Sequence, residues 1–168
     1  MASTEQRLQE RMVALIRSFG LHQPDRTPCG EPVAVSVAHA LMELARDEGL
    51  SPTALAARLR LDRSTVTRLV QQLAARGWLA RERDPRDGRA ARLRLTPAGR
   101  ELAAQLAEAR AAKFARLLAA VPPEEREPVL RALDVLVDAL DAGGTSDEVA
   151  ALPLVGLAGG GARADRVR

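Results

Sequence analysis

The sequence predicts a mainly α-helical fold with one small β-hairpin. Of its 168 residues, 46% are apolar, whereas aromatic residues make up 2% and tyrosine is absent. Much of the apolar content is alanine and leucine, which favour helices over strands. Signals for helix starts recur along the chain, and one stretch has the alternating pattern of paired strands. The length suits one domain with its own core.

The first predicted helix covers residues 4–19. Its apolar side chains recur at helical spacing and therefore form one stripe, consisting of Leu8, Met12, Leu15, Ile16 and Phe19. Gly20 follows at the position of a C-cap. Residues 20–32 contain three prolines and two glycines, so they are predicted to form a loop.

Three consecutive helices are predicted next, at residues 33–48, 52–59 and 63–76. Ser51 followed by a proline is a strong start signal, because serine caps a helix and proline fits its first turn. Asp62 is the cap of the third of these helices. The side chains expected to face inward are Val33, Val37, Ala40, Leu41 and Leu44 in the first helix and Val66, Leu69, Val70 and Leu73 in the third.

A β-hairpin is predicted after these helices, with strands at residues 78–83 and 90–95 around a polar tip at residues 84–89. Leu93 and Leu95 alternate with two arginines, as a half-buried antiparallel strand requires. Thr96 followed by a proline repeats the start signal and begins a long helix at residues 97–120. The prolines at positions 122 and 123 are expected to break this helix before a last one that extends to residue 140.

The first and last helices carry apolar stripes that a chain of this size does not cover by itself. We therefore expect residues 4–20 and 97–142 to pair with a second copy of the chain in a homodimer. They are expected to flank a lobe at about residues 33–96 within a single domain, residues 4–142. Residues 143–168 are rich in glycine and alanine and are predicted to be a disordered tail.

The positive charge of the chain is concentrated in its middle. The net charge is only +3, but residues 51–94 contain eleven arginines against four acidic residues, a charge of +7 that leaves −4 for the rest. A basic block in a mildly acidic scaffold is typical of a nucleic-acid-binding surface. The alternative is an ordinary solvated charged surface. The basic block also argues against a protein-interaction module that kept the fold and lost nucleic-acid binding.

Two capped helices joined by a short turn and followed by an arginine-rich hairpin are typical of a winged helix-turn-helix. In the second of these helices the candidate DNA contacts lie near the N-terminal end, opposite the apolar face, and are Arg63, Ser64, Thr65, Thr67 and Arg68. Short hydroxyls can approach base edges and phosphates, and an arginine can donate two hydrogen bonds to guanine. Alternatively, the three hydroxyls simply fill a first turn that tolerates polar residues.

Several motifs together resemble the MarR family of bacterial regulators. The likeness spans about residues 8–140, and the segments that carry it are residues 50–56, 61–70, 77–79, 84–89 and 95–99. The Asp-x-Arg pattern followed by Leu-Thr-x-x-Gly is fairly specific. The resemblance implies a DNA-binding homodimer whose first and last helices interlock, with two winged lobes that meet successive major grooves of a palindromic double-stranded operator.

The resemblance also implies which wing residues contact DNA. In that family the wing arginine seven residues before the threonine of the Leu-Thr motif enters the minor groove, and this position is Arg89. Asp87 would orient it, and Arg86 is a second candidate. A guanidinium on a turn tip suits a narrow, electronegative minor groove.

Other function classes find little support in the sequence. The chain has two histidines and one cysteine, no glycine-rich phosphate loop before a helix, and no nucleophile motif, so we expect no enzyme and no cofactor. His22, His39 and Cys29 lack metal-ligand spacing, so no metal is expected. A single cysteine excludes an internal disulfide, and neither a signal pattern nor a membrane-length apolar run occurs, which predicts a cytoplasmic protein without membrane contact.

The resemblance implies regulation by a small molecule, because related proteins bind aromatic or phenolic acids where the dimerisation helices meet the DNA lobe. Arg17, His22 and His39 are candidates to line such a pocket, which suits a small anionic aromatic ligand that releases a repressor from its operator. His39 is alternatively a helix residue satisfied by a nearby carbonyl. A second alternative is an oxidant-sensing repressor that uses Cys29, although the tyrosines that activate such thiols in some relatives have no counterpart here.

Overall fold

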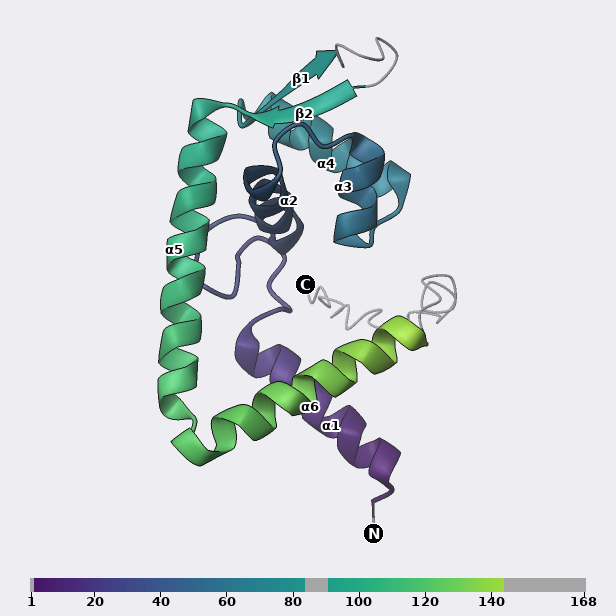
Figure 1. Ribbon diagram of the computed structural model, residues 1–168, viewed down its shortest axis with the longest axis vertical. Coiled ribbons are helices and arrows are strands. Elements are labelled where there is room, and N and C mark those ends of the chain that lie inside the picture. The colour runs from purple at the N-terminus through teal and green to yellow at the C-terminus, as the bar shows by residue number, and fades with distance from the viewer. Residues whose placement is uncertain (1, 84–90, 144–168) are drawn as a thin grey trace, which may run out of the picture. The chain divides into compact units, whose positions relative to one another are not determined.

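The structure, a computed structural model, describes residues 2–83 and 91–143. These residues form six helices and one two-stranded antiparallel sheet, in the order α1 to α4, β1, β2, α5 and α6 (Figure 1). The described part of the chain divides into two compact units, with the division between residues 123 and 124. The predicted mainly α fold with one hairpin is confirmed.

Helix α1 spans Thr4–Phe19, as predicted. It begins with a reciprocal capping box, in which the Gln6 amide N–H donates to Ser3 Oγ at 3.3 Å and the Ser3 amide N–H donates to Gln6 Oε1 at 2.8 Å. Gly20 ends the helix in the left-handed conformation, with φ of 90°.

Helix α2 spans Val35–Arg46 and is shorter at both ends than predicted. It begins later because the Val33 N–H donates to the Glu31 carbonyl at 2.9 Å, which keeps the chain in a turn. It ends earlier because the next residues turn to meet the hairpin. The Leu93 N–H donates to the Leu50 carbonyl at 2.9 Å, and these two residues form an isolated bridge.

Helices α3, Pro52–Leu59, and α4, Arg63–Ala75, begin at the predicted caps. Ser51 Oγ accepts the Ala54 N–H at 3.1 Å, and Asp62 Oδ1 accepts the Thr65 N–H at 2.7 Å. Between them Arg60 adopts the left-handed conformation, with φ of 53°, and turns the chain sharply. The short connection places α3 against α4 in a helix-turn-helix (Figure 1).

Strand β1, Leu79–Arg83, pairs with β2, Ala91–Leu95, in an antiparallel register that sets Leu79 opposite Leu95. Leu93 and Leu95 are both buried, as their alternation with arginines predicts. The predicted tip of the hairpin falls on residues 84–90, outside the described part of the chain.

Helix α5 spans Pro97–Ala120, and α6 spans Pro123–Ala142. Thr96 caps α5 by accepting the Gly99 N–H at 3.1 Å, and its own hydroxyl donates to the Gly77 carbonyl at 2.6 Å. Of the two prolines expected to interrupt the helix, Pro123 is already the first residue of α6. The fixed φ of proline suits a first helical turn. The predicted tail lies almost wholly in residues 144–168, outside the described residues.

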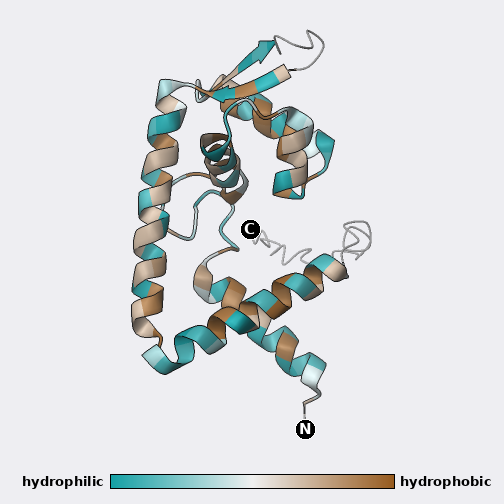
Figure 2. Ribbon diagram, in the orientation of Figure 1, coloured by the Kyte–Doolittle hydropathy of each residue, from teal (hydrophilic) through white to brown (hydrophobic). Residues whose placement is uncertain are grey.

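The hydrophobic core belongs to the lobe built from α2, α3, α4, the sheet and the first turns of α5. The inward-facing residues predicted for α2 and α4 are all buried. By contrast, neither α1 nor α6 contains a buried residue, although both carry apolar side chains along their length (Figure 2). Within residues 2–83 and 91–143, no helix combines the length and the apolar character needed to cross a membrane.

Candidate functional site

The outer face of α4 carries four of the five predicted contact residues in exposed positions. Arg63, Ser64, Thr67 and Arg68 are exposed, whereas Thr65 is half-buried. The opposite face, from Val66 to Leu73, is buried in the core and fixes the orientation of the helix. The sequence pattern therefore divided α4 correctly into an inner and an outer face.

Gln71 is a further candidate that the sequence analysis missed. It is exposed and lies three residues after Arg68 and four after Thr67, so it extends the same outer stripe by one turn. A glutamine in a major groove can pair with adenine through two hydrogen bonds. The helical spacing of positions 64, 67, 68 and 71 was the signal available in the sequence.

The hydroxyls of the first turn of α4 are hydrogen-bonded within the helix. Ser64 Oγ and Thr65 Oγ1 donate to the two carboxylate oxygens of Asp62, each at 2.6 Å. Thr67 Oγ1 donates to the Arg63 carbonyl at 2.8 Å. The hydrogen bonds from Ser64 and Thr65 hold the pKa of Asp62 far below its usual range. The carboxylate is therefore ionised throughout the physiological range.

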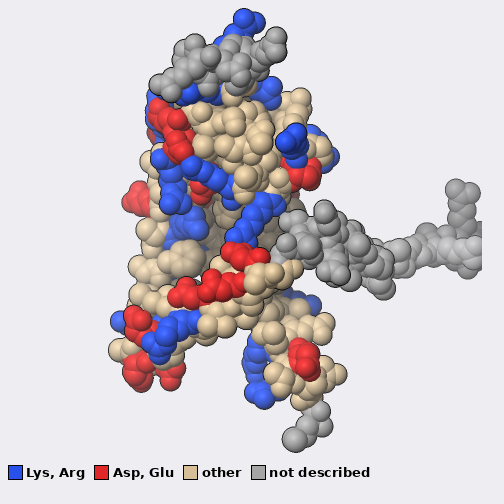
Figure 3. All heavy atoms as spheres, turned by 45° about the vertical axis from the view of Figure 1, so that its right-hand side comes forward, with Lys and Arg blue, Asp and Glu red and all other residues tan. Residues whose placement is uncertain are grey.

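Several arginines of the basic block are paired with acidic residues of the lobe. Arg58 lies 2.5 Å from Asp47 and 3.5 Å from Glu43. Arg94 lies 2.8 Å from Glu82 and 3.3 Å from Glu48. Basic and acidic side chains accordingly lie side by side on the face shown in Figure 3. Local pairing therefore offsets part of the predicted charge of +7.

Arg63 and Arg68 differ from these paired arginines. Both are exposed on α4, and neither has an ion-pair partner among residues 2–83 and 91–143. Their positive charge adds to the partial positive charge of the helix N-terminus. This combination suits the binding of a polyanion.

The predicted wing contacts Arg86, Asp87 and Arg89 lie outside the described residues. Strand β1 leads toward that segment with Arg81 and Arg83, which are both exposed. The described part of the hairpin therefore continues the basic character of α4 as far as residue 83.

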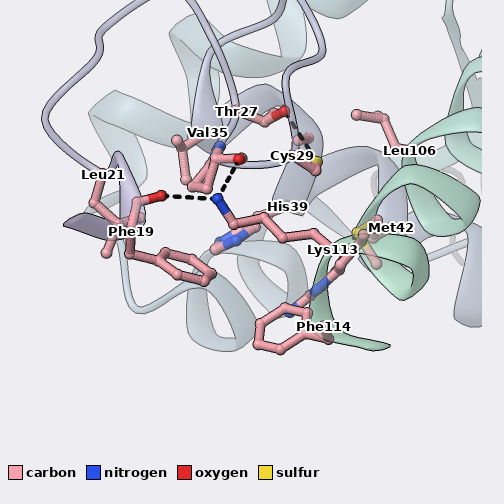
Figure 4. A pocket seen from close by; sticks show the side chains of 13 residues that line it. Phe19, Leu21, Thr27, Cys29, Val35, His39, Met42, Leu106, Lys113 and Phe114 are labelled. Atoms are coloured by element: carbon pink, nitrogen blue, oxygen red, sulfur yellow. Dashed lines mark hydrogen bonds between the residues drawn. The ribbon is translucent and has the colours of Figure 1, made fainter. Parts of the chain in front are cut away.

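A pocket of about 80 Å³ lies where α2, α5 and the loop after α1 meet (Figure 4). Its wall is mostly apolar and includes Phe19, Leu106 and Phe114, while Arg110 and Lys113 supply two cations. An apolar wall with a few polar groups is the lining composition that small-molecule sites share.

Lys113 ties three parts of the chain together at this pocket. Its Nζ donates to the Pro28 carbonyl at 2.6 Å and to the Phe19 carbonyl at 3.2 Å, and it lies 4.7 Å from the centroid of the Phe19 ring (Figure 4). The end of α1 and the following loop are thereby attached to α5.

The residues predicted to line an effector pocket are only partly brought together. His39 lines the pocket, whereas Arg17 and His22 are not among its lining residues. Partial burial and the charge of Arg110 lower the pKa of His39, against a smaller opposing effect of Glu43. Cys29 also lines the pocket, and its Sγ lies 3.1 Å from Thr27 Oγ1.

Comparisons with known proteins agree with this architecture. The model of the MarR family matches residues 33–90. An uncharacterized HTH-type transcriptional regulator of Mycobacterium leprae is 31% identical over 110 residues, which cover 66% of this chain and 77% of that protein. An HTH-type transcriptional regulator of Mycobacterium tuberculosis is 33% identical over 110 residues, with the same shares of both chains covered.

Solved structures share the fold over most of the chain. FabT of Streptococcus pneumoniae, in complex with DNA, has a TM-score of 0.73 at 19% identity, covering 83% of this chain and 99% of that one. The PcaV transcriptional regulator of Streptomyces coelicolor has a TM-score of 0.65 at 26% identity over the same shares. In complex with its natural ligand, PcaV has a TM-score of 0.57 at 27% identity, again over 83% and 99%.

Proposed function

The chain belongs to the MarR family of transcriptional regulators, and on this premise we propose that it is a homodimeric repressor released from its operator by a small anionic ligand. It is a DNA-binding regulator and not an enzyme. The proposal concerns three further properties: which residues read the operator, how two copies assemble, and what releases them. Because its target is DNA, we place the repressor in the cytoplasm.

The exposed stripe on α4 is the observation that carries the proposal for operator reading. Arg68 presents guanidinium donors that fit guanine, and Gln71 presents an amide that fits adenine. Arg63 lies at the helix N-terminus, where it contacts phosphate. By resemblance to the family, Arg89 would enter the minor groove, with Asp87 and Arg86 beside it.

Homodimer formation is supported by the apolar side chains that the chain leaves exposed outside its lobe. Leu15 on α1, Leu117 on α5 and Leu133 on α6 are 44% to 50% exposed. Pairing of these helices between two copies would remove this apolar surface from water. A two-fold dimer would then require an inverted-repeat operator with half-sites about 10 base pairs apart.

Control by an anionic ligand is supported by the pocket between α2 and α5. Arg110 and Lys113 would attract a carboxylate, while Phe19 and Phe114 would pack against an aromatic ring. A ligand that binds more tightly to the dimer arrangement that cannot hold DNA will favour that arrangement. It can then lower operator affinity by no more than the ratio of its affinities for the two arrangements. PcaV, which shares the fold, binds a natural ligand.

Operator selection tests the DNA part of the proposal. Purified protein is used to select binding sites from random duplexes, and Arg68→Ala is compared with Arg7→Ala, an exposed arginine on α1. Arg68→Ala should lower specific affinity by about 1–3 kcal/mol and relax one position of the operator, because one bidentate base contact is lost. A site with no inverted repeat, or no effect of Arg68→Ala, would contradict the proposal.

Challenge of the operator complex with benzoate and its hydroxylated derivatives tests the ligand part. We expect release of wild-type protein and of Cys29→Ser, and a weaker response of Arg110→Met and His39→Ala, with operator affinity preserved in all of them. If peroxide releases the wild type but not Cys29→Ser, and the aromatic acids have no effect, the oxidant-sensing alternative is correct.

A further inference from the structure

The hydroxyl groups on α4 present lone pairs, and not protons, to their surroundings. Each hydroxyl has one proton to donate, and Ser64 and Thr65 give theirs to Asp62, while Thr67 gives its proton to the Arg63 carbonyl. What remains on each oxygen is the capacity to accept. Ser64 and Thr67 are exposed on the outer stripe and therefore face a ligand as acceptors.

We propose that Asp62 is a specificity-determining residue, which makes Ser64 a hydrogen-bond acceptor toward the bases and selects amino bases over keto bases at the position that Ser64 meets. In the major groove, adenine N6 and cytosine N4 are donors, whereas guanine O6 and N7 and thymine O4 are acceptors. A hydroxyl whose proton is already committed pairs with the first group and is repelled by the second. The inference rests on the proposed function, in which the outer face of α4 meets base edges.

The geometry around Asp62 fixes the direction of the hydrogen bond from the Ser64 hydroxyl. Its Oδ1 accepts both the Ser64 hydroxyl at 2.6 Å and the Thr65 N–H at 2.7 Å, and Oδ2 accepts the Thr65 hydroxyl. Distances of this length are typical of hydrogen bonds to an ionised acceptor, which are stronger than neutral ones. An ionised carboxylate has no proton to return, so Ser64 cannot reverse the direction of its bond.

This arrangement also gives a reason for an exposed carboxylate on a face that meets a polyanion. Asp62 repels phosphates, yet it caps α4 and orients two hydroxyls at once. Arg68, one helical turn beyond Ser64, has donors only. The stripe therefore changes from acceptor to donor along α4, and we expect an amino base opposite Ser64 and a guanine opposite Arg68.

Two substitutions at position 62 distinguish the effect of the Asp62 oxygen as a hydrogen-bond acceptor from the effect of its negative charge. Asp62→Asn and Asp62→Gly both remove one negative charge, and both residues are accepted at N-caps. Asparagine retains Oδ1, which can still accept the Ser64 hydroxyl and the Thr65 N–H, whereas glycine leaves the Ser64 hydroxyl free to donate. Asp62→Asn is thus the matched control for the general gain in DNA affinity that loss of a negative charge produces.

The measurement is selection from randomised duplexes, with Ser64→Ala identifying the position that Ser64 meets. We expect a roughly two- to tenfold preference for adenine or cytosine there in the wild type and in Asp62→Asn, as one neutral hydrogen bond provides. Asp62→Gly should lose this preference and keep guanine at the Arg68 position. If Asp62→Gly does not fold, Asp62→Ser replaces it. The serine hydroxyl is too short to accept hydrogen bonds from both Ser64 and Thr65, so this variant should lose the same preference.

An amino preference that persists in folded Asp62→Gly or Asp62→Ser would overturn the inference, because the proton of Ser64 would then be held by something else. No change of preference in Ser64→Ala would overturn it as well. Failure of the proposed function is recognised separately, since in that case Arg68→Ala would also leave every operator position unchanged.

Discussion

The lobe and the outer helices use similar apolar residues with opposite results. The largest fully buried side chains all lie between Val37 and Leu106, within the lobe, and Leu41 and Leu44 have no exposed surface. On α1 and α6, Leu15 is 50% exposed and Leu140 is 66% exposed. An amphipathic pattern thus shows that a helix face needs a cover, but not whether the same chain provides it.

Helix α5 belongs to both regions. Positions 99, 103, 106, 110, 113 and 117 follow the alternating spacing of four and three residues that keeps side chains on one helix face. Gly99, Ala103 and Leu106 are buried against the lobe, whereas Leu117 is 48% exposed. The change from buried to exposed side chains along this face occurs at Arg110 and Lys113, the two cations of the pocket. A ligand there would bind at the boundary between the covered and the uncovered part of one helix face.

Truncation of the core should produce the largest effect. Leu41→Ala should lower the free energy of unfolding by about 2–5 kcal/mol, because it leaves a cavity in a fully buried site. Val135→Ala on α6, at a side chain that is 67% exposed, is the control and should change it by less than about 0.5 kcal/mol. Urea unfolding provides the measurement, and equal losses in both variants would remove the contrast between the two regions.

A charge on the exposed stripe of α5 should weaken dimerisation. Leu117→Glu should cost about 1.5–3 kcal/mol per protomer, the transfer free energy of a buried leucine. Both protomers carry the change, so the dimer loses about 3–6 kcal/mol, or roughly a hundred- to ten-thousandfold in affinity. Ala112→Glu, on the opposite face of α5, adds the same charge and should leave the dimer intact. Light scattering across protein concentrations distinguishes them. A wild type that is monomeric at micromolar concentration would refute the homodimer.

The joint between the lobe and α5 should tolerate no added side-chain atom. A Cβ on Gly99 would lie 2.0 Å from the carbonyl oxygen of Trp78, so one backbone has to move. We expect Gly99→Ala to lower the free energy of unfolding by about 1–3 kcal/mol, and Ala98→Ser, in the same turn but exposed, to have little effect. Thermal unfolding tests this. An unchanged melting temperature for Gly99→Ala would contradict a close contact between these two backbones.

The ion pairs of the lobe should contribute much less than its core. Glu48 lies 3.3 Å from Arg94 and 3.7 Å from Arg100, and all three side chains are about half exposed. Glu48→Gln should therefore cost only about 0.2–1 kcal/mol, and less at high salt. Unfolding of both proteins at low and high ionic strength measures this difference. A loss that is independent of salt would point to packing instead of charge.

The smallest effect concerns His39. Partial burial and Arg110 lower its pKa below the ordinary value of 6.5, so the folded protein binds this proton less readily than the unfolded chain does. Stability should therefore decrease as the pH falls through 6.5, and His39→Gln should flatten that decrease. Melting temperatures at several pH values provide the test, and a steeper decrease in His39→Gln would show that the sign is wrong.

Local signals made most of the fold predictable. Ser51, Asp62 and Thr96 mark the starts of α3, α4 and α5 because a helix cap depends on only a few adjacent residues. The ends of α2 were not predictable in the same way, since Leu50 leaves the helical path to pair with Leu93 far along the chain.

The two candidate sites also differ in how far local sequence signals predict them. The outer face of α4 follows from helical periodicity, and the alternative that its hydroxyls are satisfied locally describes the bonds of Ser64 and Thr65. The cations of the pocket come from α5, and Lys113 reaches a carbonyl 85 residues away. No local pattern predicts that contact, because it depends on how α5 packs against α2 and the loop.

Trp78 is the chain's single tryptophan, and its surroundings make it an optical reporter of the joint between α4, the hairpin and α5. Its carbonyl accepts the Thr96 N–H at 3.1 Å, and the Arg76 guanidinium lies 5.0 Å from the ring centroid. A shift of α4 relative to α5 would move the indole with respect to this cation and alter its emission. Intrinsic fluorescence can therefore follow the unlabelled protein as it binds operator or ligand, with one indole in each chain just beyond the end of α4.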